Sequence, residues 1–292
     1  MDRAMPSISG YGSIAANLGQ IDNKGIEATL STLNVNIPNK VTWSTSFMYS
    51  TNRNKIKHLY GNMVDVLDEE GNVIGQREDD DVQNGWYIGH GIDDIYDYKY
   101  IGIWQMGEEL EANKYGKKPG DPKLLDVNSD GVINDDDKVW LGSKIPLHRL
   151  SISSNLNLFK CIDFSFLLRG EFGWKAVDNM ARNEDNRFFD TSNSVWNEYW
   201  TPWNPSTEYA SLGSNSGNPT VNIYKNRNYI KMQNMSLSYT FPKKWMKKIQ
   251  VQDLRLSFNV DNAFTISGWD TSDPVVKAIS PRIWTFGVNM TL

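Results

Sequence analysis

The sequence predicts an all-β protein, an antiparallel up-and-down transmembrane β-barrel segment of about seven to nine strands. Three observations predict this fold. Apolar and polar residues alternate in stretches of about ten residues, short and long connections alternate along the chain, and no apolar run is long enough for a membrane helix. A barrel strand needs only about 9–11 residues, and one of its faces can be polar. The modest overall hydrophobicity is therefore compatible with a membrane barrel.

Composition narrows the classes of protein further. The 292 residues are enough for one large domain or two ordinary ones. The formal net charge of −5 argues against a nucleic-acid partner, because neutralising phosphates requires a basic surface. Cys161 is the only cysteine, so an internal disulfide framework is excluded.

Five segments carry the strongest alternation, with aromatic and aliphatic residues on one face and mostly Ser, Thr and Asn on the other. This period of two is typical of strands with one apolar face. Two weaker segments complete the set, and the second changes register near Gln233 and Asn234, which predicts a β-bulge. The strong segments are residues 41–50, 150–158, 162–172, 253–261 and 284–292, and the weaker ones are 25–36 and 228–241.

The connections between these strands are unequal. Short turns alternate with long connections, so an up-and-down sheet would have all its long loops at one end, as outer-membrane barrels do. Parity then requires that the first long interval contain either no wall strand or two. The extended residues 96–106 could pair with 85–91, and residues 176–200 form the one helical-looking tract. The short turns are 37–40, 159–161 and 242–250, and the long connections are 57–148, 174–227 and 262–281.

An acidic loop at residues 126–137 has the spacing of a calcium-binding loop. Gly131 permits the sharp turn, and an Asp closes the loop where an EF-hand has Glu. The alternative is a solvated Asp/Asn/Gly turn without metal. If the loop holds a structural Ca²⁺, its ligands are Asp126, Asn128, Asp130, the carbonyl of Val132, Asn134 and Asp137.

Three tryptophans, Trp196, Trp200 and Trp203, fall near one face of the helical-looking tract and could stack on a sugar. The alternative is that they only pack that helix onto neighbouring loops. No nucleophile, phosphate-loop or zinc motif is present, and the three histidines lack metal-type spacing. The chain is therefore predicted not to be an enzyme.

Several segments resemble the SusC/RagA family of TonB-dependent outer-membrane transporters and keep the order they have in that family. They are residues 19–27, 119–122, 126–137, 168–173, 228–239, 256–262, 281–282 and 285–288. The resemblance implies a barrel of about 22 strands with a plug in its lumen. It also implies outer-membrane localisation, import of oligosaccharides or peptides, a SusD-like surface lipoprotein as partner, and energy from the TonB complex through an N-terminal part. In such a transporter, substrate contacts in this chain would come from loop aromatics such as Trp86, Tyr87, Trp196 and Trp200.

A barrel of about 22 strands needs far more than 292 residues. Residues 1–292 are therefore expected to be the C-terminal part of such a barrel, with lipid against the apolar face, and no plug or signal peptide is recognised in them. The alternative is a soluble, Ca²⁺-stabilised β-sandwich that binds carbohydrate. The scarcity of charge on the polar face favours the barrel, since a sandwich exposes that face to bulk water.

Overall fold

A computed structural model of the chain describes residues 2–4, 10, 13–15, 19–68, 70–178, 198–214, 219–269, 272–276 and 278–292. Most of the helical-looking tract, including Trp196, lies outside these residues. Its described beginning is the short strand β13, Lys175–Val177, which pairs with β14, Tyr224–Asn226. Near the N-terminus β1, Asp2–Ala4, pairs with β2, Ser13–Ala15.

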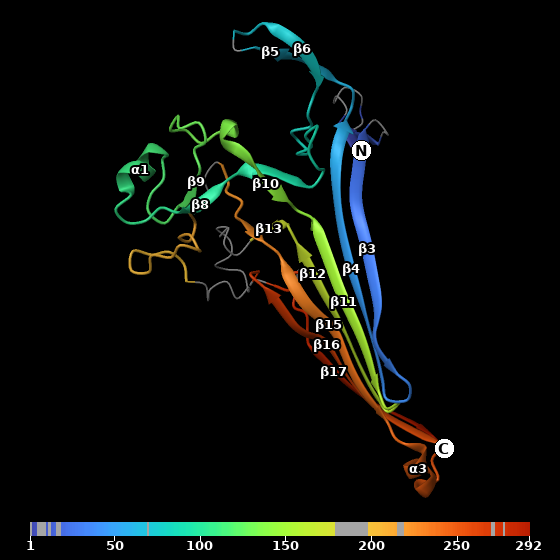
Figure 1. The fold of residues 1–292 in the computed structure, drawn as a ribbon. Coiled ribbons are helices and arrows are strands. Elements are labelled where there is room, and N and C mark those ends of the chain that lie inside the picture. Colours follow the sequence, from blue (N-terminus) through green and yellow to red (C-terminus); the bar gives the residue numbers. More distant parts are fainter. Residues whose placement is uncertain are drawn as a thin grey trace.

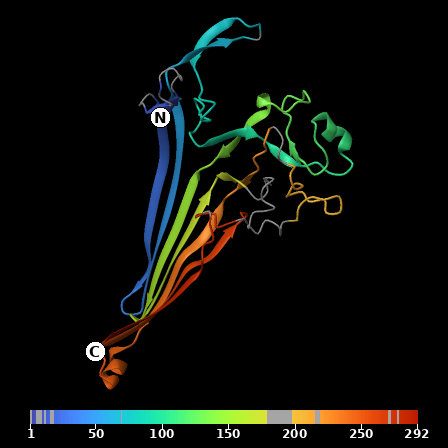
Figure 2. The same cartoon turned by 180° about the vertical axis from the view of Figure 1, so that it is seen from behind.

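Seven long strands form one antiparallel sheet in the order β17-β16-β15-β12-β11-β4-β3 (Figures 1 and 2). Each strand lies beside the long strand next to it in the chain, which is the predicted up-and-down arrangement. The strands are β3 Gln20–Ile37, β4 Val41–His58, β11 His148–Leu158, β12 Ile162–Phe172, β15 Tyr229–Thr240, β16 Asp253–Ser267 and β17 Ile283–Thr291. The smaller sheets of the described residues have two strands each, so the alternative of a sandwich with two large facing sheets is not found there.

The first long connection contributes no strand to the seven-stranded sheet in its described residues. Strand β4 pairs with β11 from Val41 opposite Leu158 to Thr51 opposite His148, so the described interval between them adds no strand to the wall. The prediction that residues 96–106 pair with 85–91 is wrong. The strand β7, Asp94–Tyr98, pairs with β10, Lys138–Ser143, while β8, Tyr100–Ile103, pairs with β9, Pro122–Leu124.

Local backbone chemistry explains why residues 85–91 do not form that partner strand. Gly85 and Gly89 have positive φ angles of 71° and 92°, a conformation that turns the chain. The Gly89 N–H donates to the Ile56 carbonyl, and the Ile56 N–H donates to the His90 carbonyl. The segment is thereby held beside the upper end of β4.

Turn chemistry fixes the opposite end of the sheet. Phe159 and Lys160 both have positive φ, at 53° and 57°, and the Cys161 N–H donates to the Leu158 carbonyl at 2.9 Å. Two successive positive φ angles give a two-residue turn the twist that matches its flanking strands. The third connection at this end contains α3, Lys243–Met246, and the 3-10 turn η5, Lys247–Ile249.

The predicted bulge is present. The pairing of β12 with β15 shifts register: Leu167 lies opposite Asn234 and Leu168 opposite Met232, which leaves Gln233 as the additional residue. Strands β3 and β4 are longer than predicted, at 18 residues each. Their ends nearest the long loops are polar on both faces, so the alternation that identified the strands stops before the strands do.

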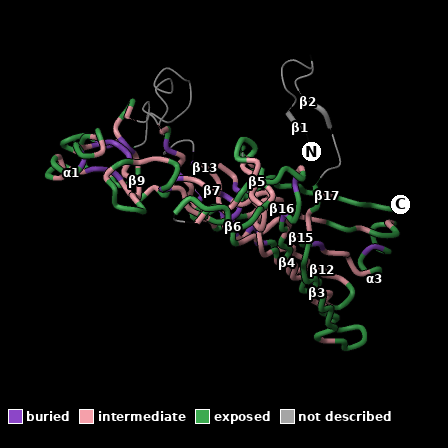
Figure 3. The backbone as a smooth tube through the Cα atoms, turned by 90° about the horizontal axis from the view of Figure 1, so that it is seen from above, coloured by how far each residue is buried: buried purple, intermediate pink, exposed green. Residues whose placement is uncertain are grey.

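The long connections carry the remaining elements. The first contains the projecting hairpin of β5, Met63–Leu67, and β6, Val73–Glu78, together with α1, Glu109–Lys114, and the 3-10 turn η2, Asp135–Asp137. Buried residues gather around α1 and β9, while exposed and intermediate residues dominate the sheet (Figure 3). Across the described part of the chain, no helix is long and apolar enough to cross a membrane.

Candidate transport surface and loop unit

The two faces of the seven-stranded sheet differ in chemistry. Register places Arg149 opposite Glu171, Ser151 opposite Arg169 and Asn155 opposite Ser165 on the polar face. The same pairing places Leu150, Ile152 and Leu156 on the opposite, apolar face, which continues onto every other strand. Large side chains of that face that are exposed to the surroundings are Ile26, Leu30, Trp43, Phe47, Leu237, Leu256, Trp284, Phe286, Val288 and Met290.

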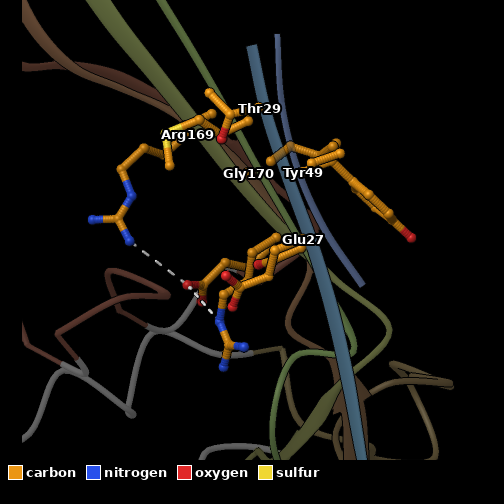
Figure 4. A pocket seen from close by; sticks show the side chains of 12 residues that line it. Glu27, Thr29, Tyr49, Arg169 and Gly170 are labelled. Carbon is orange, nitrogen blue, oxygen red and sulfur yellow. Dashed lines mark ion pairs between the residues drawn. The ribbon is translucent and has the colours of Figure 1, made fainter. Parts of the chain in front are cut away.

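A charged cluster occupies the polar face near the ends that lead into the long loops. The Arg149 Nε lies 3.7 Å from Glu171 Oε1, and the Arg169 guanidinium lies 3.9 Å from the same oxygen. These groups and Glu27 line a cavity of about 220 Å³. Figure 4 shows Arg169 and Glu27 on one side of the strands and the Tyr49 ring pointing away on the other. The cluster can hydrogen-bond and pair with charged groups of either sign.

A second polar group lies toward the tight turns. Asp163 on β12 accepts a hydrogen bond from the Asn157 amide, and the Arg255 guanidinium lies 3.1 Å from its other oxygen. Arg255 also donates to the Ser238 hydroxyl. The polar face therefore carries polar side chains along its length, as a water-filled or protein-filled barrel interior does.

The connection between β16 and β17 folds back onto the polar face. Lys231 of β15 donates to Asp273 Oδ2 at 2.7 Å, and both side chains are less than a tenth exposed. Asp273 Oδ1 accepts N–H bonds from Val275 and Val276. Burial alone would raise the pKa of Asp273, but the Lys231 and backbone hydrogen bonds outweigh it, so the pKa lies below its ordinary value.

Arg227 is a buried cation that sequence reasoning missed. Its side chain is almost completely buried, and its guanidinium lies over the rings of Trp174 and Trp269 at 4.9 and 5.1 Å. The stacking joins the start of one long connection to the start of another. No spacing rule could have identified this group, because the three residues come from separate segments of the chain.

Two long connections merge into one folded body, which we call the loop unit and define as residues 94–143, 198–214 and 219–226. Ile103, Trp200 and Ala210 form one buried cluster, and Val221 and Ile223 form a second. The Ser211 N–H donates to the Gly120 carbonyl, and the Asn222 amide and Tyr224 hydroxyl both donate to Asp97. This packing fixes the positions of the long loops at this end of the sheet.

The structure places the predicted substrate contacts in different parts of the long connections. Trp200 is 6% exposed, and its indole N–H donates to Gln105 Oε1 at 2.9 Å, so it is part of the core of the loop unit. Trp86 exchanges two backbone hydrogen bonds with Asp81 on the first connection. Trp203, by contrast, is 91% exposed. Substrate contact by Trp86, Tyr87, Trp196 and Trp200 remains a prediction.

Tyr87 belongs to an aromatic cluster with partners that the sequence did not indicate. Its ring lies 4.9 Å from that of Tyr96 and 5.3 Å from that of Trp140. His90 stacks on Trp140 at 3.5 Å, with the rings 6° from parallel. Trp140 remains 39% exposed, so the cluster presents an aromatic surface beside the top of β4.

The acidic loop has the turn geometry that its sequence predicts. Asp126 accepts the N–H groups of Ser129 and Gly131 at 2.6 and 2.9 Å, and Asp130 accepts the Val132 N–H. The fully buried Asp137 accepts the N–H groups of Val127 and Asn134. Burial would raise the pKa of Asp126, but these backbone donors and Tyr115 lower it more, so the carboxyl stays ionised.

These contacts fit a hard cation. The predicted carboxylate, amide and main-chain oxygens are brought into one loop. Asp126 Oδ2 accepts two hydrogen bonds, from Tyr115 and Gly131, whereas Asp126 Oδ1 accepts one, from Ser129, and so retains acceptor capacity for a cation. Within the described residues, no group of three His, Cys, Asp or Glu side chains alone has metal-binding geometry. A Ca²⁺ here would consequently depend on Asn128, Asn134 and the Val132 carbonyl as well as on the carboxylates.

Known proteins share sequence and fold with this chain. No protein-family model matches the chain. The chain is 29% identical over 281 residues to TonB-dependent receptor P26 of Formosa agariphila, covering 94% of this chain and 28% of that receptor. It is 25% identical over 279 residues to TonB-dependent receptor P3 of the same organism, covering 93% and 27%. The chain thus spans less than a third of these relatives.

Solved structures share the fold. A structure of the RagAB peptide transporter superposes with a TM-score of 0.68 at 16% identity, covering 98% of this chain and 31% of that one. The RagAB peptide importer in its closed-closed state gives 0.66 at 18% identity. The matched proteins are named receptors and transporters, in keeping with the prediction that this chain is not an enzyme. Together these similarities confirm the predicted resemblance to the SusC/RagA family of TonB-dependent transporters, of which this chain matches one portion of the barrel.

Proposed function

We propose that the chain is part of the wall and external loops of a TonB-dependent importer in the outer membrane. The observation that carries this proposal is the seven-stranded sheet with one exposed apolar face and one polar face, within a chain similar to TonB-dependent receptors. The apolar face suits lipid, since apolar side chains on a barrel exterior need no covering protein. The polar face suits a lumen that contains a plug, water and passing substrate.

The cargo that we propose is an oligosaccharide or a peptide, handled together with a SusD-like surface lipoprotein. The names of the RagAB structures support the peptide. The aromatic cluster around Tyr87 and Trp140 supports the sugar, because aromatic rings offer flat apolar surfaces for a sugar ring. The seven-stranded sheet by itself exposes the unpaired edges of β3 and β17, so we expect transport to require a complete barrel.

Uptake by the complete transporter tests this proposal. A strain without the transporter gene should fail to grow on one class of nutrient, oligosaccharide or peptide, and the intact gene should restore growth. Deleting the TonB-contacting part should abolish that uptake while the barrel still inserts. Unchanged growth of the deletion strain on every oligosaccharide and peptide tested would contradict the proposal, as would recovery of the intact protein in a soluble fraction.

We also propose a structural Ca²⁺ at residues 126–137. The ligand spacing and the inward-turned oxygens of Asp126 and Asp130 support it. The ion would stiffen an external loop rather than take part in chemistry. Calorimetric titration of the chelator-treated transporter should show one binding event that the Asp126→Asn, Asp130→Asn double variant loses. An identical titration by the double variant would rule out the site.

A further inference from the structure

The apolar face of β4 ends abruptly in a cationic patch. Phe47, Tyr49 and Thr51 follow the apolar alternation, and the next residues on that same side of the strand are Arg53, Lys55 and Lys57. Lys24 of β3 lies directly opposite Arg53 in the pairing register. All four cationic side chains are exposed. The outward surface therefore changes from aromatic to strongly positive within about two residues of the strand.

These cations line a pocket rather than a flat surface. The pocket has a volume of about 700 Å³ and lies between β3, β4 and the segment 89–94. That segment is held beside β4 by the two backbone hydrogen bonds of Ile56 and by the Ile92 N–H, which donates to Asn54 Oδ1 at 2.8 Å. His90, which belongs to this segment, also stacks on Trp140, and this contact holds the segment in place. The pocket is thus a formed feature of the loop end of the sheet.

Charge within the pocket is unbalanced. Its cations are Lys24, Arg53, Lys55 and Lys57, and its carboxylates are Asp22 and Asp94. Lys57 lies 3.9 Å from Asp22, whereas the other three cations have no carboxylate within 4 Å among the residues that the structure describes. Asp94 accepts the Gly91 N–H at 2.8 Å, which orients its carboxylate but leaves its charge in place. The pocket thus has two more cations than carboxylates, and three of its cations remain without an ion-pair partner that could compete with an anion.

We propose that this pocket binds the phosphate of an anionic lipid headgroup in the outer leaflet. The inference depends on the proposed membrane barrel, because only then does the apolar face below the pocket meet acyl chains. Position selects lipid as the occupant: the cations continue the apolar face, and a transported molecule would pass along the opposite, polar face. The chemistry fits as well, because Lys and Arg near a membrane surface attract anionic headgroups, and guanidinium groups bind phosphate oxygens in pairs.

Lipid titration of the complete transporter tests the proposal. The purified protein, in a zwitterionic detergent, is titrated with monophosphorylated lipid A and observed by native mass spectrometry. The variant Lys24→Gln, Arg53→Gln, Lys55→Gln, Lys57→Gln should bind this lipid at least about tenfold more weakly. A matched control removes the same charge at the other end of the sheet by replacing the exposed Lys243, Lys244, Lys247 and Lys248 with Gln. The control should bind within about twofold of the original protein.

Further titrations show whether the pocket recognises the phosphate of a lipid or a soluble anion. Dephosphorylated lipid A should bind as weakly to the original protein as the phosphorylated lipid does to the pocket variant. Inorganic phosphate and a soluble uronate oligosaccharide should not displace the lipid at millimolar concentration. Equal affinity of the original and pocket-variant proteins overturns the proposal, as does equal weakening by the control or displacement by a soluble anion.

Failure of this inference differs from failure of the proposed function. A transporter that inserts and supports uptake, but whose lipid affinity is unchanged in the pocket variant, rejects only the lipid pocket. A protein that does not insert into membranes rejects both. If the fourfold variant does not fold, the double variant Lys55→Gln, Lys57→Gln is titrated instead and should bind at least about threefold more weakly.

Discussion

Lys231 and Asp273 form a buried ion pair that fastens the last long connection to the polar face of the sheet, with Nζ and Oδ2 2.7 Å apart. The two residues are 42 positions apart in the sequence, on β15 and beyond β16. Because both side chains are nearly inaccessible, neither charge is well solvated without the other. The connection is therefore held against the sheet by a pair whose separation would leave a buried charge.

Removing one partner should release this connection. Asp273→Ala is expected to destabilise the local structure by about 3–5 kcal/mol, the typical cost of an uncompensated buried charge. Hydrogen exchange of the Val275 and Val276 amides, which bond to Asp273, should accelerate strongly. The control Asp253→Ala, at an exposed strand end, should leave the exchange of these amides unchanged. Unaltered exchange in Asp273→Ala would show that the ion pair does not hold the connection.

Gly120 should be irreplaceable in the loop unit. A Cβ at this position would lie 2.5 Å from Trp200 Cε3, and the φ of +94° also disfavours any other residue. Gly120→Ala is expected to cost about 1–3 kcal/mol from overpacking in addition to backbone strain. Gly116→Ala is the matched control, because Gly116 also has a positive φ, of +63°, but a Cβ there would meet no atom within 4 Å. Limited proteolysis should cut the loop unit faster in Gly120→Ala than in Gly116→Ala, and equal cutting would show that the contact with Trp200 is unimportant.

Tyr100 should make the loop unit sensitive to alkali. Burial raises the pKa of its phenol to about 12, and among the described residues its hydroxyl has no hydrogen-bond partner. In the unfolded chain the phenol ionises near its ordinary pKa of about 10. Between these two values the unfolded state binds fewer protons, so the free energy of unfolding falls as the pH rises from about 10 to 12.

The Tyr100→Phe variant should lose this pH dependence. It removes the titrating group and an unbonded buried hydroxyl, so stability at neutral pH should change by less than about 1 kcal/mol. Proteolysis of the loop unit, followed from neutral pH into the alkaline range above about pH 10, should show a smaller loss of resistance in the variant. Identical pH profiles for the two proteins would mean that Tyr100 does not contribute to the alkaline transition.

Removing Ca²⁺ should loosen the acidic loop. Chelation is expected to increase protease cleavage within residues 126–137, because the ion would neutralise carboxylates that otherwise repel one another. Asp136→Asn is a useful control, since Asp136 is outside the predicted ligand set. It should retain the effect of chelator, whereas Asp126→Asn should be cleaved rapidly with or without chelator. A cleavage rate independent of chelator in the original protein would contradict the proposed metal.

The sequence by itself determined the strands and the topology of the seven-stranded sheet. Period-two alternation identified all seven strands, the change of period at Gln233 identified the bulge, and the order of short and long connections determined the topology. These features depend on neighbours along the chain, whose chemistry the sequence displays directly. The spacing of residues 126–137 likewise determined which oxygens share one loop.

Only the tertiary structure decided how the long connections fold. The pairing of β7 with β10, the burial of Trp200 against Gly120 and the pocket beside Lys55 join segments that are far apart in the sequence. Such contacts result from long-range packing and backbone hydrogen bonds, which leave no period in the sequence to read.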